Sequence, residues 1–329
     1  MSLRIDGQYC GRTLAAFAAA LVVTHAAGAA DTYPVRPIRM IVPQSAGGST
    51  DLVARVVAQR LDDALKQQVV VDNRPGAGSI NGTEIVAKAT PDGYTLLAIA
   101  ASFTITPSLR KTLPFDPVRD FAPITQLVIL PHILVVHPSV PATTVKDLIV
   151  RLRSKPGELN CATSGVGTST HLALEQFMYM TRTKMLPVPY KGGAPGMTAL
   201  LGGEVQLYFA TISTALPHVK AGKLRALAVT SKKRSVSAPE FPTVAESGVA
   251  GYEHTSWVGL LAPAKTSRPV IARLNAEAVT IINSPQVKAL MLREGLESVG
   301  TTPEELAAII QTEIARWMKL VKVAGIEAE

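Results

Sequence analysis

The sequence predicts an α/β protein made of two lobes, with the second lobe inserted into the first. Short β-branched or apolar runs alternate with helical stretches, and glycine-rich turns join them. The length of 329 residues exceeds what one compact core usually supports. Apolar strands separated by helical crossovers are typical of sheets covered on both faces, so we expect a mainly parallel sheet flanked by helices in each lobe.

The strands and helices follow from local patterns along the chain. A β-branched run predicts the first strand at 38–42, and Leu52, Val56 and Leu61 lie near one face of a helix at 51–64. Further strands are expected at 69–71, 95–99, 133–136, 159–162, 187–190, 205–209, 224–230 and 258–262. Further helices are expected at 80–89, 145–153, 171–180, 197–201, 213–220, 269–283, 285–294 and 303–323, the last three each opened by a proline.

The first thirty residues have the order of a secretory signal peptide. Arg4 and Arg12 precede an apolar run at 14–23, and small residues follow at 26–30. This run is shorter than the roughly 20 residues that span a bilayer, which favours a cleaved signal over a membrane anchor. We therefore expect cleavage near Ala30, export to the periplasm and a soluble mature protein.

The same patterns suggest where the lobes begin and end. After the signal peptide at 1–30, residues 31–127 and 255–329 are predicted to form lobe 1, and residues 128–254 the inserted lobe 2. The lobes would move about crossing segments near 127–130 and 251–256. A cleft between the lobes is then the natural ligand site, because ligands of parallel α/β sheets bind at the carboxyl ends of strands.

Composition argues against several functions. The 33 Lys and Arg outnumber the 25 Asp and Glu, but they are scattered, and the longest cluster, 232–234, is interpreted as a solvated loop. Aromatic residues make up only 5%, which disfavours a nucleic-acid stacking platform. Once Cys10 leaves with the signal peptide, Cys161 is alone and no intramolecular disulfide is possible.

Catalytic patterns are weak. Cys161 and His171 could be imagined as a thiol dyad, but Cys161 ends an apolar strand and is better explained as an inert buried thiol. No G-x-S-x-G elbow and no paired-histidine metal spacing occurs. A secreted hydrolase is therefore the disfavoured alternative, and we expect no catalytic residue, metal or cofactor.

Four glycine-rich loops indicate anion binding. The loops at 44–51, 74–79, 163–170 and 191–196 each follow a strand and precede a helix, so backbone N–H groups and the helix dipole point outward together. One such loop alone would be an ordinary capped turn, but four across two lobes favour a ligand. Because no P-loop or ordered dinucleotide fingerprint is present, a carboxylate is favoured over a nucleotide.

Ordered motifs run along the whole mature chain. They are Pro34-Val35-Arg36-Pro37-Ile38, Gly47-Gly48-Ser49-Thr50-Asp51, Asn73-Arg74-Pro75-Gly76-Ala77-Gly78, Ala89-Thr90-Pro91-Asp92-Gly93-Tyr94-Thr95-Leu96, Leu113-Pro114-Phe115-Asp116-Pro117, Pro189-Tyr190-Lys191-Gly192, Leu200-Leu201-Gly202-Gly203 and Gly222-Lys223-Leu224-Arg225-Ala226-Leu227-Ala228-Val229-Thr230. Together with the signal peptide they resemble the Bug family, the periplasmic solute receptors of tripartite tricarboxylate transporters. The resemblance implies a two-lobed "Venus flytrap" periplasmic binding protein of type II, a small carboxylate or amino-acid-like ligand, and no catalysis.

The resemblance also implies a set of pocket residues. Gln44 stands where the family usually has an aromatic residue, Phe103 where His is frequent, and Ala210 where Asp or Asn is common. The last departure favours a dicarboxylate, or an aromatic acid facing Phe103, over an amino acid. Lys191 either adds a full charge or points to solvent. The implied set is Gln44, Ser45, Ala46, Gly47, Gly48, Gly78, Ser79, Ala101, Ser102, Phe103, Ser164, Gly167, Thr168, His171, Lys191, Ala210 and Thr211.

The expected partners follow from the same resemblance. A monomeric receptor would deliver its ligand to the membrane permease subunits of a tripartite transporter. The alternative is a ligand-dependent partner of a sensor kinase in a two-component system, with no transport role. The residues do not separate these two possibilities, since both partners would sense closure of the lobes, and nucleic acid is not an expected partner of either.

Overall fold

The computed structural model describes residues 33–190 and 192–325. The predicted signal peptide, its cleavage near Ala30 and Lys191 lie outside the described residues. Among the helices that are described, none combines the length and apolar composition that a membrane span requires.

Ten strands of the described chain form one continuous twisted sheet, in the order β2-β1-β3-β9-β4-β7-β5-β6, with β8 and β10 also paired to β4. The two ends of the sheet are parallel, whereas the centre is antiparallel. The strands are β1 (Ile38–Val42), β2 (Val69–Asn73), β3 (Thr95–Ala100), β4 (Phe121–Val136), β5 (Asn160–Thr163), β6 (Leu186–Pro189), β7 (Leu207–Thr211), β8 (Arg225–Val229), β9 (Thr255–Pro263) and β10 (Glu297–Ser298).

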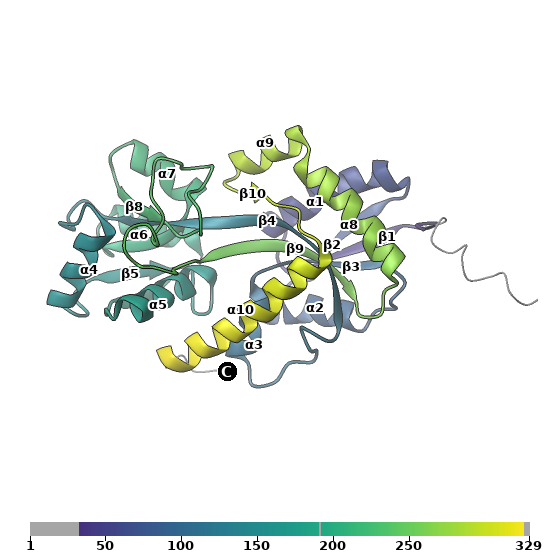
Figure 1. Ribbon diagram of the computed structural model, residues 1–329, viewed down its shortest axis with the longest axis horizontal. Helices are drawn as coiled ribbons and strands as arrows, with labels where there is room; N and C mark the ends of the chain where they lie inside the picture. The colour runs from purple at the N-terminus through teal and green to yellow at the C-terminus, as the bar shows by residue number, and fades with distance from the viewer. Residues whose placement is uncertain (1–32, 191, 326–329) are drawn as a thin grey trace, which may run out of the picture.

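Helices cover both faces of this sheet, as the alternating pattern predicts (Figure 1). Pro269, Pro285 and Pro303 occupy the first turns of α8, α9 and α10, as expected. The helices are α1 (Ser49–Leu65), η1 (Ala77–Ser79), α2 (Ile80–Ala87), α3 (Ser102–Leu109), α4 (Val145–Ser154), α5 (Ser169–Thr181), α6 (Gly193–Leu201), α7 (Ile212–Lys220), α8 (Arg268–Asn283), α9 (Pro285–Arg293) and α10 (Pro303–Ala324).

The long strand β4 joins the two halves of the molecule, with β9 beside it (Figure 1). Residues 121–131 of β4 pair with β9, and residues 132–136 pair with β7 and β8. The expectation of a mainly parallel sheet in each lobe is therefore corrected to a mixed sheet. The reason is topological, because a chain that leaves one half along β4 and returns beside it along β9 must run in the opposite direction.

The hydrophobic core is divided in the same way. Successive side chains of a strand point to opposite faces, so Met40 and Leu96 pack into one cluster of the first half, while Ile41 and Leu97 pack into the cluster on the other face. In the second half, the neighbouring residues Ile133 and Leu134 of β4 likewise pack into two different clusters. These clusters support two lobes, whereas the lobe boundaries at 127/128 and 254/255 stay a prediction.

One helix was not expected. No helix was predicted between the strand at 95–99 and the strand at 133–136, but α3 forms there, and its sequence contains β-branched residues and Pro107. Local propensity therefore opposes a helix here. Packing overrides it, since Phe103 and Ile105 are buried in one cluster with Leu306 and Ile310 of α10.

Candidate functional site

A cavity of about 440 Å³ lies between the two halves of the molecule. We call it the cleft. Its size falls within the range of small-molecule sites. The residues that line it are Gln44, Ala77, Gly78, Ser79, Ala100, Ala101, Ser102, Ile105, Thr106, Leu109, Arg110, Val166, Gly167, Thr168, Ser169 and Ser256.

Three segments of the first half build one wall of the cleft. Gln44 follows β1, Ser79 follows β2, and Ser102 follows β3, so the wall stands at the carboxyl ends of three parallel strands. Gln44 Nε2 donates to Ser79 Oγ at 3.0 Å, and Ser79 Oγ lies 3.4 Å from Ser102 Oγ. Gln44 Oε1 is buried without a hydrogen-bond partner among the described residues. The three side chains form a polar row along this wall.

The backbone of this wall is unusual between β2 and α2. Gly76, Ala77, Gly78 and Ser79 all have positive φ angles, of 130°, 46°, 65° and 82°. Such a run requires glycine at two positions and stores strain at the others. The chain thereby turns sharply and presents Ala77, Gly78 and Ser79 together at the cleft.

The opposite wall comes from the turn between β5 and α5 in the second half. Gly167 has a φ of 74°, and a Cβ at this position would lie 2.4 Å from Leu109 Cδ1 of α3. The backbone therefore favours glycine, and any larger residue would displace the tip of the Leu109 side chain of the first half. The two halves meet here, at one end of the cleft.

Three helices begin at the cleft. Ser79, Ala101 and Thr168 are the N-cap residues of α2, α3 and α5, and all three line the cavity. None of these helices has a side-chain hydrogen bond at its N-cap. The partial positive charge of three helix N-termini therefore favours an anion in the cleft.

Most of the cleft-lining residues of α3 were not predicted. Once α3 is known to be helical, Ser102, Ile105, Thr106 and Leu109 fall on one face at helical spacing, and all four line the cleft. Arg110 follows them at the C-cap and also lines the cleft. In the sequence, only this helical spacing indicates that the four residues share a face, and Pro107 and the β-branched residues argue against a helix there.

Seven of the residues implied by the resemblance line the cleft, namely Gln44, Gly78, Ser79, Ala101, Ser102, Gly167 and Thr168. Others lie elsewhere. Ser45, Ala46, Gly47 and Gly48 are exposed and do not line the cavity. The amide of Gly47 donates to Asp51 Oδ2 at 2.9 Å, so this N–H is satisfied within its own loop.

Asp51 stabilises that loop as a carboxylate. Burial by itself would raise the pKa of Asp51, but hydrogen bonds from Arg55, the Gly47 amide and Asn73 outweigh it and hold the pKa below its usual value. Asn73 also donates to the Gln44 carbonyl at 3.1 Å, which fixes the start of the cleft wall. The first glycine-rich loop is thus a support for Gln44.

Two predicted residues lie in hydrophobic cores. The Phe103 side chain is buried beside Phe121, with ring centroids 5.1 Å apart, so it does not face the cleft. The Ala210 side chain is buried in the second half, where Ala210 pairs with Ile133. Each side chain lies on the core-facing side of its element, which a linear motif does not reveal. The hypothesis of an aromatic acid facing Phe103 therefore loses its basis.

The remaining predicted residues support the second wall or lie apart from it. His171 Nδ1 accepts a hydrogen bond from the Gly167 amide at 3.1 Å, and His171 is buried. Ser164 Oγ lies 2.7 Å from the hydroxyl of Tyr208, whose pKa burial raises. Thr211 caps α7 and is not part of the cavity lining. Cys161, expected to be an inert thiol, is buried, and burial raises its pKa.

A buried histidine pair lies where the chain crosses between the halves. The rings of His132 and His254 are 5.5 Å apart, and His254 Nε2 lies 2.8 Å from the hydroxyl of Ser169, which lines the cleft. Burial lowers the pKa of His132 to about 4 and also depresses the pKa of His254. Both rings are therefore neutral at pH 7.

Two α/β halves with a cleft between them that favours an anion are typical of solute-binding receptors. Comparisons with known proteins place the chain within this class. The family model described as the tripartite tricarboxylate transporter family receptor, TctC, matches residues 53–326. The chain belongs to this family, which confirms the Bug/TctC resemblance.

Individual relatives agree with this assignment. The chain is 38% identical to the protein BugT of Bordetella pertussis over 298 residues, covering 90% of this chain and 91% of BugT. It is 36% identical to R. palustris Rpa4515, solved with adipate, with a TM-score of 0.75 over 90% of this chain and 99% of that one. It is 29% identical to MatC from Rhodopseudomonas palustris, solved with malate, with a TM-score of 0.71 over 88% of this chain and 100% of that one.

Proposed function

We propose that this protein is a periplasmic receptor that binds a small dicarboxylate in the cleft. The observation that carries the proposal is the convergence of three helix N-termini without side-chain caps on a cavity that Arg110 also lines. Relatives solved with adipate and malate support a carboxylate ligand. The ligand would be held mainly by backbone N–H groups, with the Ser79 and Ser102 hydroxyls as further donors.

Arg110 suggests how a second carboxylate is recognised. It stands at the C-terminal end of α3, whereas Ser102 stands at the N-terminal end, so the two residues mark opposite ends of one cleft-lining helix. A helix of eight residues is about 12 Å long. A ligand lying along α3 would place one carboxylate at the helix N-terminus and direct the other towards the guanidinium group. This arrangement favours a dicarboxylate over a monocarboxylate.

The receptor would work by closing its two lobes around the ligand. β4 and β9 carry the chain between the halves, and Gly167 already lies close to Leu109 at one end of the cleft. Closure would bury the anion between the walls and present a changed surface to the permease subunits of a tripartite tricarboxylate transporter. Binding and delivery need no bond-breaking step, consistent with a family of receptors.

The test is a calorimetric titration of the purified protein with adipate, malate and glutamate, and with the monomethyl ester of adipate. The ester keeps the length of adipate but removes one negative charge. We expect saturable binding of at least one dicarboxylate, and weaker binding of the ester than of adipate. Binding of glutamate alone, or of adipate and its ester with equal affinity, would contradict the proposal.

A further inference from the structure

A buried carboxylate lies behind the helix that lines the cleft. Glu313 belongs to α10 and is only 7% exposed, and no step of the proposed function uses it. Its Oε2 atom accepts hydrogen bonds from Thr104 Oγ1 at 2.7 Å and from Trp257 Nε1 at 2.9 Å. Thr104 belongs to the first turn of α3, and Trp257 belongs to β9. One carboxylate oxygen therefore ties α10 to both α3 and β9.

The same two donors hold the residue from which α3 starts. The Ala101 amide donates to the Trp257 carbonyl at 3.1 Å, and the Ala101 carbonyl accepts from the Thr104 amide at 3.0 Å. Ala101 is the N-cap residue of α3 and lines the cleft. Glu313 thus fixes a helix N-terminus of the cleft through its neighbours, although Glu313 itself does not line the cleft.

Glu313 and a ligand in the cleft would face α3 from two sides. Because an α-helix turns by about 100° per residue, Thr104 points roughly 200° away from Ser102. Ser102 lines the cleft, whereas Thr104 is buried against Glu313. A helix with its side chains is about 10–12 Å across, so a ligand carboxylate beside Ser102 would stand on the order of 10 Å from the Glu313 carboxylate. Two negative charges this close repel each other inside a protein.

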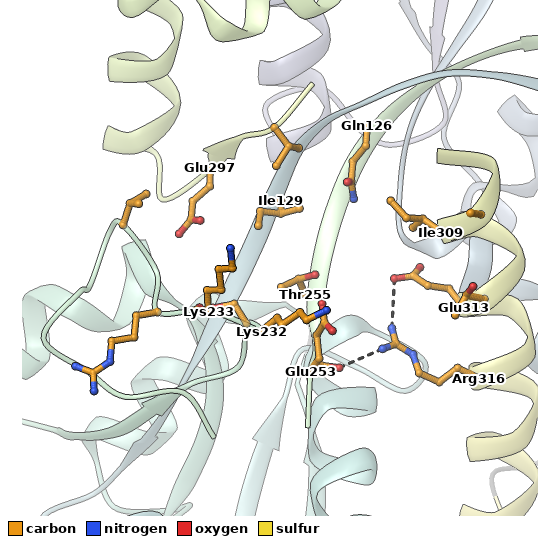
Figure 2. A pocket seen from close by; sticks show the side chains of 16 residues that line it. Gln126, Ile129, Lys232, Lys233, Glu253, Thr255, Glu297, Ile309, Glu313 and Arg316 are labelled. Carbon is orange, nitrogen blue, oxygen red and sulfur yellow. Dashed lines mark hydrogen bonds and ion pairs between the residues drawn. The ribbon is translucent and has the colours of Figure 1, made fainter. Parts of the chain in front are cut away.

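The contacts of Glu313 suit an ionised carboxylate. Such a group only accepts hydrogen bonds, and Oε2 faces two donors. The Arg316 guanidinium lies 3.3 Å from the other oxygen, Oε1, and also donates to the Glu253 carbonyl, as Figure 2 shows. Glu313 and Arg316 line a cavity of about 660 Å³ beside β4 and β9, which gives the carboxyl group a route to solvent.

Other ionisable side chains lie around this cluster. Burial lowers the pKa of His132 in β4 to about 4 and also depresses the pKa of His254, so both rings are neutral at pH 6 and above. Lys232, Lys233 and Glu297 line the same cavity as Glu313. A substitution of Glu313 leaves all five in place, so a comparison with the wild type isolates Glu313.

Glu313 can gain a proton without losing its contact to α3. Thr104 Oγ1 also lies 2.9 Å from the Ala101 carbonyl, yet a hydroxyl has only one hydrogen to donate. That hydrogen points to Glu313 when the carboxylate is ionised. When Glu313 is protonated, its own hydrogen can point to Thr104 Oγ1, and the hydroxyl hydrogen then turns to Ala101. Burial already raises the pKa of Glu313, which favours the protonated form.

We propose that Glu313 is a positioning residue of the cleft that holds the first turn of α3 in place and takes up a proton when a dicarboxylate binds. The inference rests on the proposed function of the cleft. A ligand anion on one side of α3 disfavours the ionised form of Glu313 on the other side, so binding increases the affinity of Glu313 for a proton. By linkage, the ligand binds more tightly as pH falls through the range in which Glu313 is protonated.

The variant Glu313→Gln tests the charge. Glutamine keeps an oxygen that can accept from Thr104 and Trp257 but has no negative charge. The matched control, Glu304→Gln, removes an exposed carboxylate from the same helix. We expect calorimetry at pH 7.5 to show adipate binding about 3- to 30-fold tighter in Glu313→Gln than in the wild type, and unchanged in the control. A purely structural role for Glu313 predicts the opposite sign, namely weaker binding.

Proton uptake is measured by repeating the adipate titration in Tris and in imidazole, two cationic buffers with different ionisation enthalpies. Protons that adipate itself exchanges are common to both proteins, so the difference between the wild type and Glu313→Gln reports on Glu313. We expect the wild type to take up more protons per adipate bound. We also expect its affinity to increase more steeply than that of the variant between pH 8 and pH 6.

The variants Thr104→Val and Thr104→Ser test the positioning. Valine removes the hydroxyl that meets Glu313, whereas serine keeps it, and thermal unfolding checks that both variants fold. We expect adipate to bind Thr104→Val about 3- to 10-fold more weakly than the wild type, and Thr104→Ser nearly as well as the wild type.

The outcomes separate the parts of the proposal. Equal or weaker adipate binding by Glu313→Gln, or equal proton uptake by that variant and the wild type, would overturn the role of the charge. Equal binding by Thr104→Val and Thr104→Ser would overturn the positioning. A wild type that binds no dicarboxylate would overturn the proposed function, and this inference with it.

Discussion

The two ends of helix α3 differ in the source of the positive charge that they bring to the cleft. At the N-terminal end, beside Ala101 and Ser102, backbone N–H groups that the fold holds in place supply it. At the C-terminal end, the side chain of Arg110 supplies it. Fixed dipoles need little reorganisation on binding, whereas a long side chain loses rotamer freedom. Positive potential is therefore a property of the fold at one end of α3 and a property of one replaceable side chain at the other.

The strongest change is expected from His132 in β4, the strand that joins the two halves. His132 is buried and neutral, with a pKa of about 4 against 6.5 in the unfolded chain. The unfolded state therefore binds the proton first, so the free energy of unfolding falls as pH drops from 6.5 to about 4, by about 3 kcal/mol for this group. Urea unfolding of the wild type and of His132→Gln between pH 7 and pH 4 measures this fall in the free energy of unfolding.

Other groups help to separate this effect. Burial raises the pKa of Glu313, so its contribution to stability is present at low pH and decreases as pH rises, opposite to that of His132. The lowered pKa of Asp51 matters only below its ordinary value of 3.8. We expect the His132→Gln variant to show a shallower loss of stability in this window. An identical pH slope in the two proteins would exclude His132 as the cause.

The next effect tests side-chain recognition inside the cleft. We expect Arg110→Gln to weaken adipate binding about 10- to 100-fold, because hydrogen bonds between charged groups contribute about 1.5–3 kcal/mol. Binding of the monomethyl ester should change much less. The Arg110→Lys variant, which keeps the charge but not the planar fork, should lie in between. Equal losses for adipate and its ester would show that Arg110 does not select the second carboxylate.

A comparable or smaller effect is expected where the two walls meet. In Gly167→Ala, the new methyl group would press against Leu109, and overpacking costs about 1–3 kcal/mol. The matched control is Gly222→Ala, at a similar φ of 69° but with no atom within 4 Å of the added Cβ. Thermal unfolding should show similar backbone strain in both, while calorimetry should show weakened adipate binding only in Gly167→Ala. Removing the clash with Leu109→Ala in the same chain should recover part of the affinity.

The weakest effect is expected from removing the Ser79 hydroxyl, which tests whether backbone N–H groups hold the ligand. We expect Ser79→Ala to weaken adipate binding about 3- to 10-fold, since one neutral hydrogen bond contributes about 0.5–1.5 kcal/mol. The change leaves the α2 N-terminus and the Gly78 backbone in the cleft. Calorimetry on Ser79→Ala and on Thr280→Ala, which removes an exposed hydroxyl of α8 that does not line the cleft, gives the comparison. A complete loss of binding would mean that side-chain hydroxyls, and not backbone dipoles, hold the ligand.

Most of the fold could be predicted, and the cleft only in part. The strand at 38–42 and the proline-opened helices were confirmed because their signals are local. Helix α3 was missed because its burial against α10, some 200 residues away in the chain, overrides the local preference. Because this helix was not predicted, Ile105, Thr106, Leu109 and Arg110 were absent from the predicted site.

Local signals in the sequence established the α/β class, the positions of the glycine-rich turns and the receptor family, because period, turn chemistry and ordered motifs are written in neighbouring residues. Which side chains face the cleft was settled by tertiary packing. Phe103 and Ala210 stand in motif positions but point into cores, while Arg110 carries no motif and lines the cavity. A side chain's direction depends on what packs against its element, and those contacts come from distant parts of the chain.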